Sequence, residues 1–362
     1  IYISIYISDF DGNGNVLATN EGSELVTATS FKDANNNNIL CTYDLLNRLT
    51  DETSADGESD SYTYNAISQL TKYTNKRGQS IEYTYDADGN ITGRKTPEDV
   101  VLYTYDANGN LLTIEDENGT ITRTYDSLNR VTSYTNTAGQ TIGYEYDSVG
   151  NLTKLTYPDG KTVIYTYNSV NRMTSVTDWN NRTTYYTYDT NGNLQKIVRP
   201  DGSHEVYNYD AKGQLLTITD SYANGNTINQ YYFTYDEDGN IISENSFNEP
   251  DASEISIGSS EMSYGSANQL TNFNGTAIAY DADGNALSTP LGDAWGNLTY
   301  DSLNHLTDVT VSGSAVSYGY TYDAEGYRTA KNENGIITNF TVNPNAELSQ
   351  VLMSTKNGET TY

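Results

Sequence analysis

The sequence has 362 residues, with 48 Asp or Glu and only 19 Lys or Arg, which gives a net charge of -29 at neutral pH. Nucleic acids and anionic membranes are bound through basic surfaces, so this charge argues against either as a partner. A single cysteine, Cys41, excludes an internal disulfide, and two histidines, His204 and His305, argue against a zinc site of His and Cys ligands.

The composition is also poor in aliphatic residues and rich in tyrosine. Hydrophobic residues make up 36% of the chain, and 34 residues are Tyr. A tyrosine ring packs well where its hydroxyl group keeps a hydrogen-bond partner or water. We therefore expect tyrosine to supply much of the packing, at positions where one end of the ring stays polar.

The first residues, I-Y-I-S-I-Y-I-S, alternate in a period of two. This pattern predicts a strand and does not fit the continuous apolar segment of a signal peptide. No run in the sequence approaches the ~18 apolar residues of a membrane helix. We expect a soluble chain that is one piece of a longer protein, without membrane insertion.

The next segment has the spacing of a calcium-binding loop. Asp9, Asp11 and Asn13 take positions one, three and five of such a loop, and Gly14 takes position six. Position twelve is Asn20, where the loop needs a bidentate Glu. These residues are a weak calcium candidate, and a simple turn is the favoured interpretation.

This segment is the first of about fifteen similar units, each with the pattern Tyr-Asp-x-x-Gly-Asn or a close variant. From Tyr43 to Tyr209 the units recur every 20 or 21 residues. The units begin at Phe10, Tyr43, Tyr64, Tyr85, Tyr105, Tyr125, Tyr146, Tyr167, Tyr188, Tyr209, Tyr235, Tyr264, Tyr280, Tyr300 and Tyr322. Such a period is typical of repeat architectures in which each unit is one supersecondary element.

Comparison of the units shows what each position requires. The fourth position is Asp88 in one unit but Val149 and Leu128 in others, so calcium binding is not the shared role. The fifth position is Gly or Asn in every unit except at Ser68, which predicts a positive φ, and the second position fits an Asx turn. The unit is predicted to be a turn, represented by Tyr85, Asp86, Gly89, Tyr105, Asp106, Gly109, Tyr146, Asp147, Gly150, Tyr188, Asp189 and Gly192.

The segments between these turns alternate in the manner of strands. Val163, Tyr165 and Tyr167 share one face of such a strand, and the opposite faces of these strands carry mainly Thr, Glu or Asn. A second alternating segment, 152–157, precedes it, and the tetrapeptide Pro158-Asp-Gly-Lys161 joins the two. Each unit is thus predicted to be one antiparallel β-hairpin.

About fifteen hairpins supply about thirty strands, which at ~4.8 Å per strand make a ribbon ~140 Å wide. Twist forces a sheet of that width to curl or close. A closed ribbon would have a diameter near ~45 Å, which so few aliphatic side chains cannot fill. The predicted fold class is therefore all-β, a curled and hollow spiral of repeated antiparallel β-hairpins.

The regular spacing ends after Tyr209, where steps of 26, 29 and 16 residues follow. We interpret residues 217–262 as irregular long loops inside one array, because the motif resumes on both sides; a domain boundary there is the less favoured alternative. The chain is thus predicted to be a single repeat array over residues 1–362.

The repeated Tyr-Asp-x-x-Gly-Asn/Arg-Leu pattern, with Pro-Asp-Gly or Asn-Gly turns between copies, resembles the YD-repeat, or RHS-repeat, family. That family includes bacterial Rhs polymorphic toxins, wall-associated proteins, the cocoon-forming subunits of Tc toxins and animal teneurins. The resemblance covers nearly the whole chain. It implies a spiral of β-hairpins that forms a shell around a C-terminal toxin or effector segment of the same polypeptide.

The final segment, residues 340–362, is similar to the lead-in to the core domain that follows the repeats in bacterial members. The resemblance implies a self-cleaving aspartyl protease site in that core domain, which this sequence does not reach. No toxin or plug domain is recognisable either. We therefore expect an incomplete shell, secreted or on the surface of a bacterial cell.

The shell interpretation is non-enzymatic and requires no cofactor. Most Asp residues are explained as turn residues, and His204 and His305 are isolated, so neither set indicates a catalytic site. The alternative is an extracellular carbohydrate-binding or cell-adhesion module. Its candidate glycan contacts are aromatic residues outside the repeat period, above all Trp179 and Trp295, because tyrosine and tryptophan rings can stack against sugars.

Overall fold

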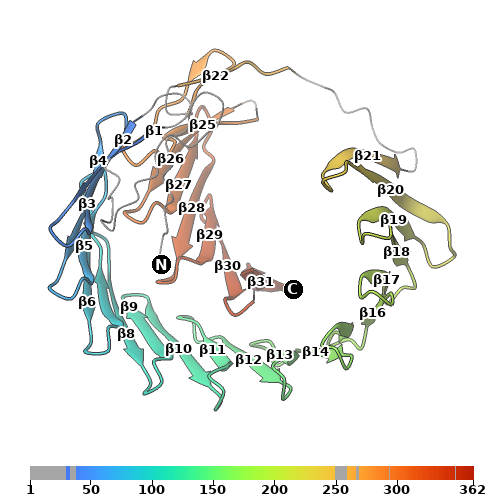
Figure 1. Cartoon of the computed structure of the whole chain (residues 1–362). Helices are drawn as coiled ribbons and strands as arrows, with labels where there is room; N and C mark the ends of the chain where they lie inside the picture. Colours follow the sequence, from blue (N-terminus) through green and yellow to red (C-terminus); the bar gives the residue numbers. More distant parts are fainter. Residues whose placement is uncertain (1–29, 33–37, 249–258, 266–268, 293, 347) are drawn as a thin grey trace, which may run out of the picture.

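The computed structural model describes residues 30–32, 38–248, 259–265, 269–292, 294–346 and 348–362. Within these ranges the chain forms 32 β-strands and no helix (Figure 1). Accordingly, none of the described segments is a helix of the length and apolarity needed to cross a membrane. The prediction of an all-β fold built from hairpins is confirmed.

The strands fall into three antiparallel sheets, of 21, 3 and 8 strands. The 21-stranded sheet, called the large sheet below, contains β1 (Ser30–Lys32), β2 (Asn38–Tyr43), β3 (Leu49–Thr53), β4 (Ser59–Tyr64), β5 (Leu70–Thr74), β6 (Ser80–Tyr85), β7 (Ile91–Lys95), β8 (Val100–Tyr105), β9 (Leu111–Asp116), β10 (Gly119–Tyr125), β11 (Val131–Thr135), β12 (Thr141–Tyr146), β13 (Leu152–Thr156), β14 (Thr162–Tyr167), β15 (Met173–Thr177), β16 (Thr183–Tyr188), β17 (Leu194–Val198), β18 (His204–Tyr209), β19 (Leu215–Ser221), β20 (Thr227–Tyr235) and β21 (Ile241–Asn248). The 3-stranded sheet contains β22 (Met262–Tyr264), β23 (Leu270–Phe273) and β24 (Thr276–Ala277). The 8-stranded sheet, called the small sheet below, contains β25 (Ser288–Leu291), β26 (Ala294–Tyr300), β27 (Leu306–Val311), β28 (Ser317–Tyr322), β29 (Arg328–Glu333), β30 (Ile336–Asn343), β31 (Gln350–Lys356) and β32 (Glu359–Thr361).

Every strand of the large sheet pairs with the strand that follows it in the chain, from β1 through β21. The register slips by one residue at the motif tyrosine of each hairpin, for example between Thr84 and Tyr85 and between Thr104 and Tyr105. A β-bulge of this kind bends the strand and increases its local twist. Its repetition at each unit explains why the ribbon curls.

The irregular loops expected over residues 217–262 are absent from the described part of this segment up to residue 248, and that expectation was wrong there. The chain instead forms a tight turn, in which Tyr222 N donates to Asn226 O at 2.9 Å, between two long strands. The extra residues lengthen β20 to nine residues. The run T-I-N-Q-Y-Y-F-T-Y supplies β-branched and aromatic side chains, which favour extension of a strand over a loop. The segment 340–362 likewise continues the small sheet through β30, β31 and β32.

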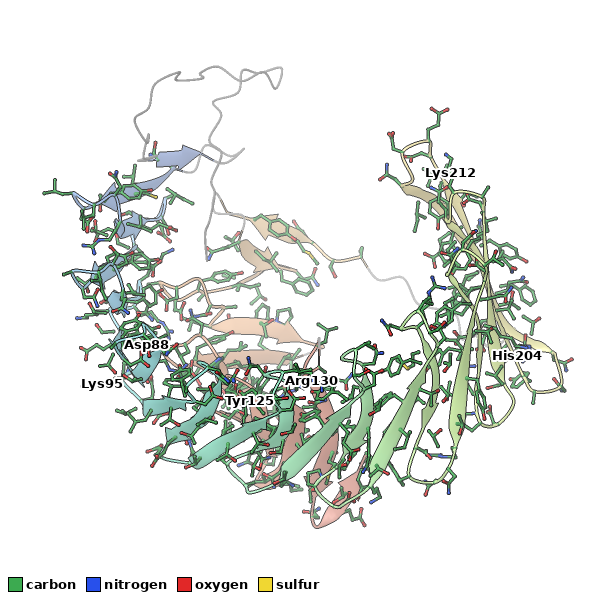
Figure 2. The ribbon with its side chains drawn as sticks, turned by 60° about the horizontal axis from the view of Figure 1, so that its bottom comes forward. Asp88, Lys95, Tyr125, Arg130, His204 and Lys212 are labelled. Carbon is green, nitrogen blue, oxygen red and sulfur yellow. The ribbon has the colours of Figure 1, made fainter. Side chains whose placement is uncertain are left out.

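The large sheet forms an open arc, and the small sheet returns to lie beside its first half (Figure 1). The drawn side chains leave the middle of the arc open, and the sheet is not closed into a barrel (Figure 2). The chain exposes 22777 Å² of surface, whereas a compact protein of 40.0 kDa exposes about 14,400 Å². The prediction of a curled, hollow shape that stays incomplete is therefore confirmed.

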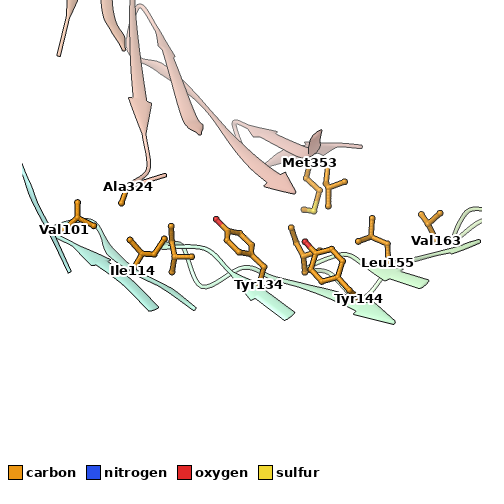
Figure 3. Packing of buried hydrophobic residues seen from close by; sticks show 11 residues of the cluster. Val101, Ile114, Tyr134, Tyr144, Leu155, Val163, Ala324 and Met353 are labelled. Atoms are coloured by element: carbon orange, nitrogen blue, oxygen red, sulfur yellow. The ribbon is translucent and has the colours of Figure 1, made fainter. Parts of the chain in front are cut away.

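The buried core is a thin layer between the two sheets. One face of β8 to β14 carries a row of apolar side chains, and the small sheet contributes three residues that cover it (Figure 3). The buried cluster contains Val101, Ile114, Ile121, Tyr134, Ile142, Tyr144, Leu155, Val163, Ala324, Leu352 and Met353. The opposite face of the strands carries exposed Thr hydroxyl groups that bond in pairs, such as Thr104 with Thr113 at 2.6 Å.

Candidate functional site at the seam between the two sheets

The repeated motif, called the YD turn below, folds as a five-residue turn around its aspartate. In the turn after Tyr85, Asp86 Oδ1 accepts hydrogen bonds from the backbone N–H groups of Asp88 at 3.0 Å and Asn90 at 2.8 Å. Its Oδ2 accepts from Asn90 Nδ2 at 3.0 Å, and Gly89 has a φ of 91°. The carboxylate therefore accepts the backbone N–H groups that have no partner strand where the chain reverses.

The same arrangement recurs at the other predicted motif residues. Asp106, Asp147 and Asp189 each accept from the backbone N–H and side-chain amide of the Asn four residues later. The side-chain amide of that Asn lowers the pKa of Asp86, Asp106 and Asp147 below their usual range. The fifth positions are left-handed, with φ values of 82° at Gly109, 101° at Gly150 and 95° at Gly192. Even Ser68, which lacks the freedom of Gly, has a φ of 66°.

The motif tyrosine joins consecutive hairpins. Tyr85 Oη donates to Leu70 O at 2.6 Å, and Leu70 is the residue that follows the preceding YD turn. Nine further tyrosines make the same bond at 2.8 to 3.0 Å, namely Tyr105, Tyr125, Tyr146, Tyr167, Tyr188, Tyr209, Tyr235, Tyr280 and Tyr322. This bond gives the ring the polar partner that its hydroxyl group requires, and it fixes the spacing between neighbours.

The predicted calcium candidate and the aspartates of the YD turns bear on whether the chain could hold a metal ion. Asp9, Asp11 and Asn13, the calcium candidate, lie outside the described residues. Among the residues that the structure describes, no group of three or more His, Cys, Asp or Glu side chains is arranged to hold a metal ion. In the YD turns, both carboxylate oxygens of an aspartate such as Asp86 already accept hydrogen bonds from N–H donors, which makes them poor metal ligands.

The two candidate glycan contacts are separate. Trp179 is half-buried, with its ring centroid 5.2 Å from that of Tyr157 and 5.1 Å from that of Tyr362. Trp295 lies in β26, paired with Pro290 of β25. The structure thus places the first tryptophan in an aromatic cluster between the sheets and the second at the far end of the small sheet, and it does not bring them together.

The most elaborate arrangement of side chains lies where the small sheet meets the large sheet, a region called the seam below. Arg77, in the turn between β5 and β6, reaches across it. Its Nε donates to Asp283 Oδ2 at 2.5 Å, and its Nη2 donates to Asp301 O at 2.6 Å and Asn304 Oδ1 at 2.7 Å. The Asp283 side chain is 4% exposed. Guanidinium forks suit this simultaneous capture of carboxylate and carbonyl groups.

The middle of the seam combines a charged pair with an acidic turn. Arg123 Nη2 donates to Glu325 Oε1 at 2.5 Å, and the same guanidinium lies 5.1 Å from the ring centroid of Tyr134. Two polar atoms in this pair, Arg123 Nη1 and Glu325 Oε2, are buried without a hydrogen-bond partner among the described residues. Burial raises the pKa of the neighbouring Asp323 to about 6.

The next part of the seam is neutral, and beyond it Tyr362 Oη donates to Asp159 Oδ2 at 2.5 Å, beside Lys161. Tyr144 Oη donates to Asn343 Oδ1 at 2.6 Å, and both residues are buried. Thr341 Oγ1 donates to Gln140 Oε1 at 2.8 Å. The residues in contact across the seam are separated by 199 to 230 residues in the chain, so one circuit of the ribbon takes about 200 residues.

Sequence reasoning missed these seam residues, because the repeat period of 20 or 21 does not reveal a second period of about 200. One signal was available. Val101, Ile121, Ile142 and Val163 hold the same position in β8, β10, β12 and β14, but Thr184 and Glu205 hold it in β16 and β18. The change from aliphatic to polar side chains marks where the small sheet stops covering the large sheet.

Comparison with known families agrees with this architecture. A model described as "Teneurin YD-shell" matches residues 65–138 and 203–352, which is more than half of the chain. The chain belongs to the teneurin YD-shell family. A model described as "RHS Repeat" also matches, at residues 43–80, 146–183 and 167–204. The resemblance to YD-repeat proteins is thereby confirmed.

Two curated relatives share part of this YD-shell chain. The tRNA nuclease WapA of Bacillus subtilis strain 168 is 34% identical over 120 residues, which is 31% of this chain and 5% of that protein. The tRNA3(Ser)-specific nuclease WapA of Bacillus spizizenii is 33% identical over 120 residues, again 31% of this chain and 5% of that protein. The chain thus spans about a twentieth of the length of these relatives.

A solved structure has the same fold. A Tc holotoxin pore from Photorhabdus luminescens aligns with a TM-score of 0.64 and 15% identity, over 89% of this chain and 21% of that one. At this identity the likeness concerns the fold alone. It agrees with the family match in making the chain a β-hairpin ribbon of the shell type.

Proposed function

We propose that this chain is a wall segment of a shell that encloses a C-terminal toxin or effector segment of the same polypeptide. The observation that carries the proposal is the seam, where side-chain contacts join parts of the curled ribbon that are about 200 residues apart in the chain. A curled sheet held together in this way can separate the segment inside it from proteases and from the solvent. The mechanism is steric, and the wall residues carry out no reaction.

The comparisons support this role. The shell families that match the chain are structural, and the fold neighbour belongs to a toxin assembly. The WapA relatives are named as nucleases, yet this chain matches only 5% of their length. A nuclease-like activity would belong to a segment beyond the matched repeats. We place the protein at a bacterial cell surface or in the secreted fraction, where such shells act.

Limited proteolysis of the full-length polypeptide tests the proposal. The segment downstream of residue 362 should resist a protease that digests the same segment expressed alone. A double variant, Arg77→Ala with Arg123→Ala, removes two guanidinium contacts across the seam and should restore digestion. Equal digestion of the downstream segment inside and outside the full-length protein would contradict enclosure.

Small-angle scattering of the chain gives an independent check on the hollow shape. A compact domain of this length has a radius of gyration near ~21 Å. The open arc should give a distinctly larger value. Glycan binding by the isolated chain, lost on Trp295→Ala but not on Trp295→Phe, would instead favour the carbohydrate-binding alternative.

A further inference from the structure

One YD turn at the seam differs chemically from the others. In most units the residue four positions after the aspartate is Asn or Arg, whose side chain donates to the second carboxylate oxygen, as Asn110 does to Asp106 Oδ2 at 2.8 Å. In the turn after β28 this position is Tyr327, which has no such donor. Asp323 Oδ1 accepts from the backbone N–H groups of Glu325 at 3.0 Å and Tyr327 at 2.9 Å. Its second oxygen accepts no bond from a side-chain amide or guanidinium among the residues that the structure describes.

The small sheet presses this turn against an acidic part of the large sheet. A cavity of about 370 Å³ opens between the two sheets, and its walls carry six carboxylates, one guanidinium and one imidazole. The large sheet supplies Arg94 from β7, Glu98 and Asp99 from the turn between β7 and β8, and Asp116 and Glu117 from the end of β9. The small sheet supplies Asp301, His305 and Asp323.

The cations near Asp323 bond to other groups, and Arg94 Nε and Arg123 Nη1 are buried without a hydrogen-bond partner among the described residues. Arg123 of β10 pairs with Glu325 at 2.5 Å, and Arg94 Nη2 donates to Ala324 O at 3.0 Å. His305 Nδ1 lies 2.9 Å from Asp301 Oδ2 in the preceding YD turn. Tyr134 and Tyr327 also lie close enough to interact with the charge of Asp323, and they bring no positive charge. No cation among the described residues forms an ion pair with Asp323, so its ionised form faces the charges of Asp116 and Glu325 without a directly bonded positive group.

We propose that the seam is a pH-responsive latch, in which protonation of Asp323 holds the two sheets together and its ionisation loosens them at the turn formed by residues 322–327. Like charges in a partly buried site disfavour each other's ionised form, so a proton that binds here removes repulsion across the seam. Burial and the charges of Glu325 and Asp116 raise the pKa of Asp323, against the opposing effect of the Tyr327 backbone N–H, to about 6. The latch is therefore tight near pH 5 and loose near pH 7.5.

The sign follows from linkage. The pKa of Asp323 is higher in the folded state than in the unfolded state, where it is 3.8. The favourable contribution of the proton is fully present below that value and is lost as the pH rises through about 6. The neutral contacts further along the seam, such as Tyr144 with Asn343, do not titrate in this range. Loosening is thus local, and the rest of the seam keeps the sheets in register.

Distance measurement across the seam tests the latch in the complete chain. Ala138 and Ile337 are exposed, and both line a groove between the two sheets. We would place a nitroxide at each position as a cysteine, after replacement of the buried Cys41 by Ala, and record distances by pulsed electron paramagnetic resonance. We expect one narrow distribution at pH 5.0 and a second, longer distance at pH 7.5, with at least a threefold change in its population.

Three variants decide the outcome. Asp323→Asn keeps the oxygen that accepts from Glu325 and Tyr327, and it should give the narrow distribution at both pH values. Asp116→Asn should move the transition to lower pH values. Asp106→Asn, at the same motif position away from the seam, should leave the pH dependence unchanged. A wild-type distribution that does not change with pH, or one that still changes in Asp323→Asn, would overturn the proposal. Circular dichroism of each variant establishes that it is folded.

Discussion

Two parts of the large sheet contain the same hairpin but bury it differently: the covered half, β8 to β14, and the uncovered half, β16 to β21. In the covered half, β8, β10, β12 and β14 place an aliphatic residue beneath the small sheet, with exposed fractions of 0 to 7% at Val101, Ile121, Ile142 and Val163. In the uncovered half, β16 and β18 place Thr184 and Glu205 at that position, and both are half-buried. Stacking of neighbouring hairpins alone therefore leaves their faces partly exposed to solvent.

This difference separates two sources of stability. Bonds within and between adjacent hairpins, such as that from Tyr188 Oη to Met173 O at 2.8 Å, are the same in both halves. Full burial is reached only where the ribbon has returned to cover itself. A repeat array is approximately a sum of unit and nearest-neighbour terms. The seam adds contacts between units about 200 residues apart and so makes the covered half more cooperative.

The largest expected effect compares a pair of residues at one strand position. Leu155 in β13 is 2% exposed under the small sheet, and Ile197 holds the same place in β17 but is half-buried. Leu155→Ala should lower the free energy of unfolding by about 3 kcal/mol, and Ile197→Ala by about 1 kcal/mol, because only the first leaves a closed cavity. Urea unfolding of both variants measures this. Equal losses would show that the small sheet adds no burial energy.

A smaller effect is expected for the neutral contact of the seam. Tyr144→Phe leaves Asn343 Oδ1 buried without its donor, so the free energy of unfolding should fall by about 1 to 2 kcal/mol. Tyr165 holds the equivalent position in the next hairpin, and its hydroxyl group makes no hydrogen bond to another described residue. Tyr165→Phe is the matched control, for which we expect a loss below about 0.5 kcal/mol. A similar loss in both would contradict a special role for the Tyr144 contact.

The bond between adjacent hairpins should respond alike in the two halves. Tyr105 Oη donates to Ile91 O at 2.9 Å in the covered half, and Tyr188 Oη makes the equivalent bond in the uncovered half. Tyr105→Phe and Tyr188→Phe should each cost about 1 kcal/mol of unfolding free energy, since each removes one partly buried hydrogen bond. A much larger cost at Tyr105 would mean that the small sheet also strengthens the bonds between neighbours.

The comparison also shows which parts of the structure a sequence can reveal. The turn chemistry is local, so the Gly or Asn at the fifth position and the Asp at the second predicted the positive φ at Gly89 and its equivalents. The alternation of Val163, Tyr165 and Tyr167 likewise predicted the faces of β14. Such features depend on neighbours within one hairpin, and one sequence contains them in full.

Contacts between distant units are a different matter. Arg77 and Asp283 are 206 residues apart, and nothing in either hairpin indicates the other. Their meeting depends on how many hairpins complete one circuit, which is set by the sum of small twists at successive bulges. The misassigned loops at 217–248 have a related cause. A longer spacing between motifs is equally compatible with a loop and with longer strands. The strands form here because β20 pairs with both β19 and β21.

The smallest expected effect uses acid to distinguish ordinary YD turns from the one at the seam. The side-chain amide of Asn110 lowers the pKa of Asp106. Its contribution to stability is present above the unfolded value of 3.8 and is lost as the pH falls through the lower folded value. Asp323 has the opposite sign, because burial raises its pKa to about 6. Urea midpoints between pH 2 and pH 7 should therefore flatten below pH 4 in Asp106→Asn and between pH 4 and pH 6 in Asp323→Asn. If both substitutions flattened the same part of the curve, the turns would be electrostatically equivalent, and coverage by the small sheet would not be what sets Asp323 apart.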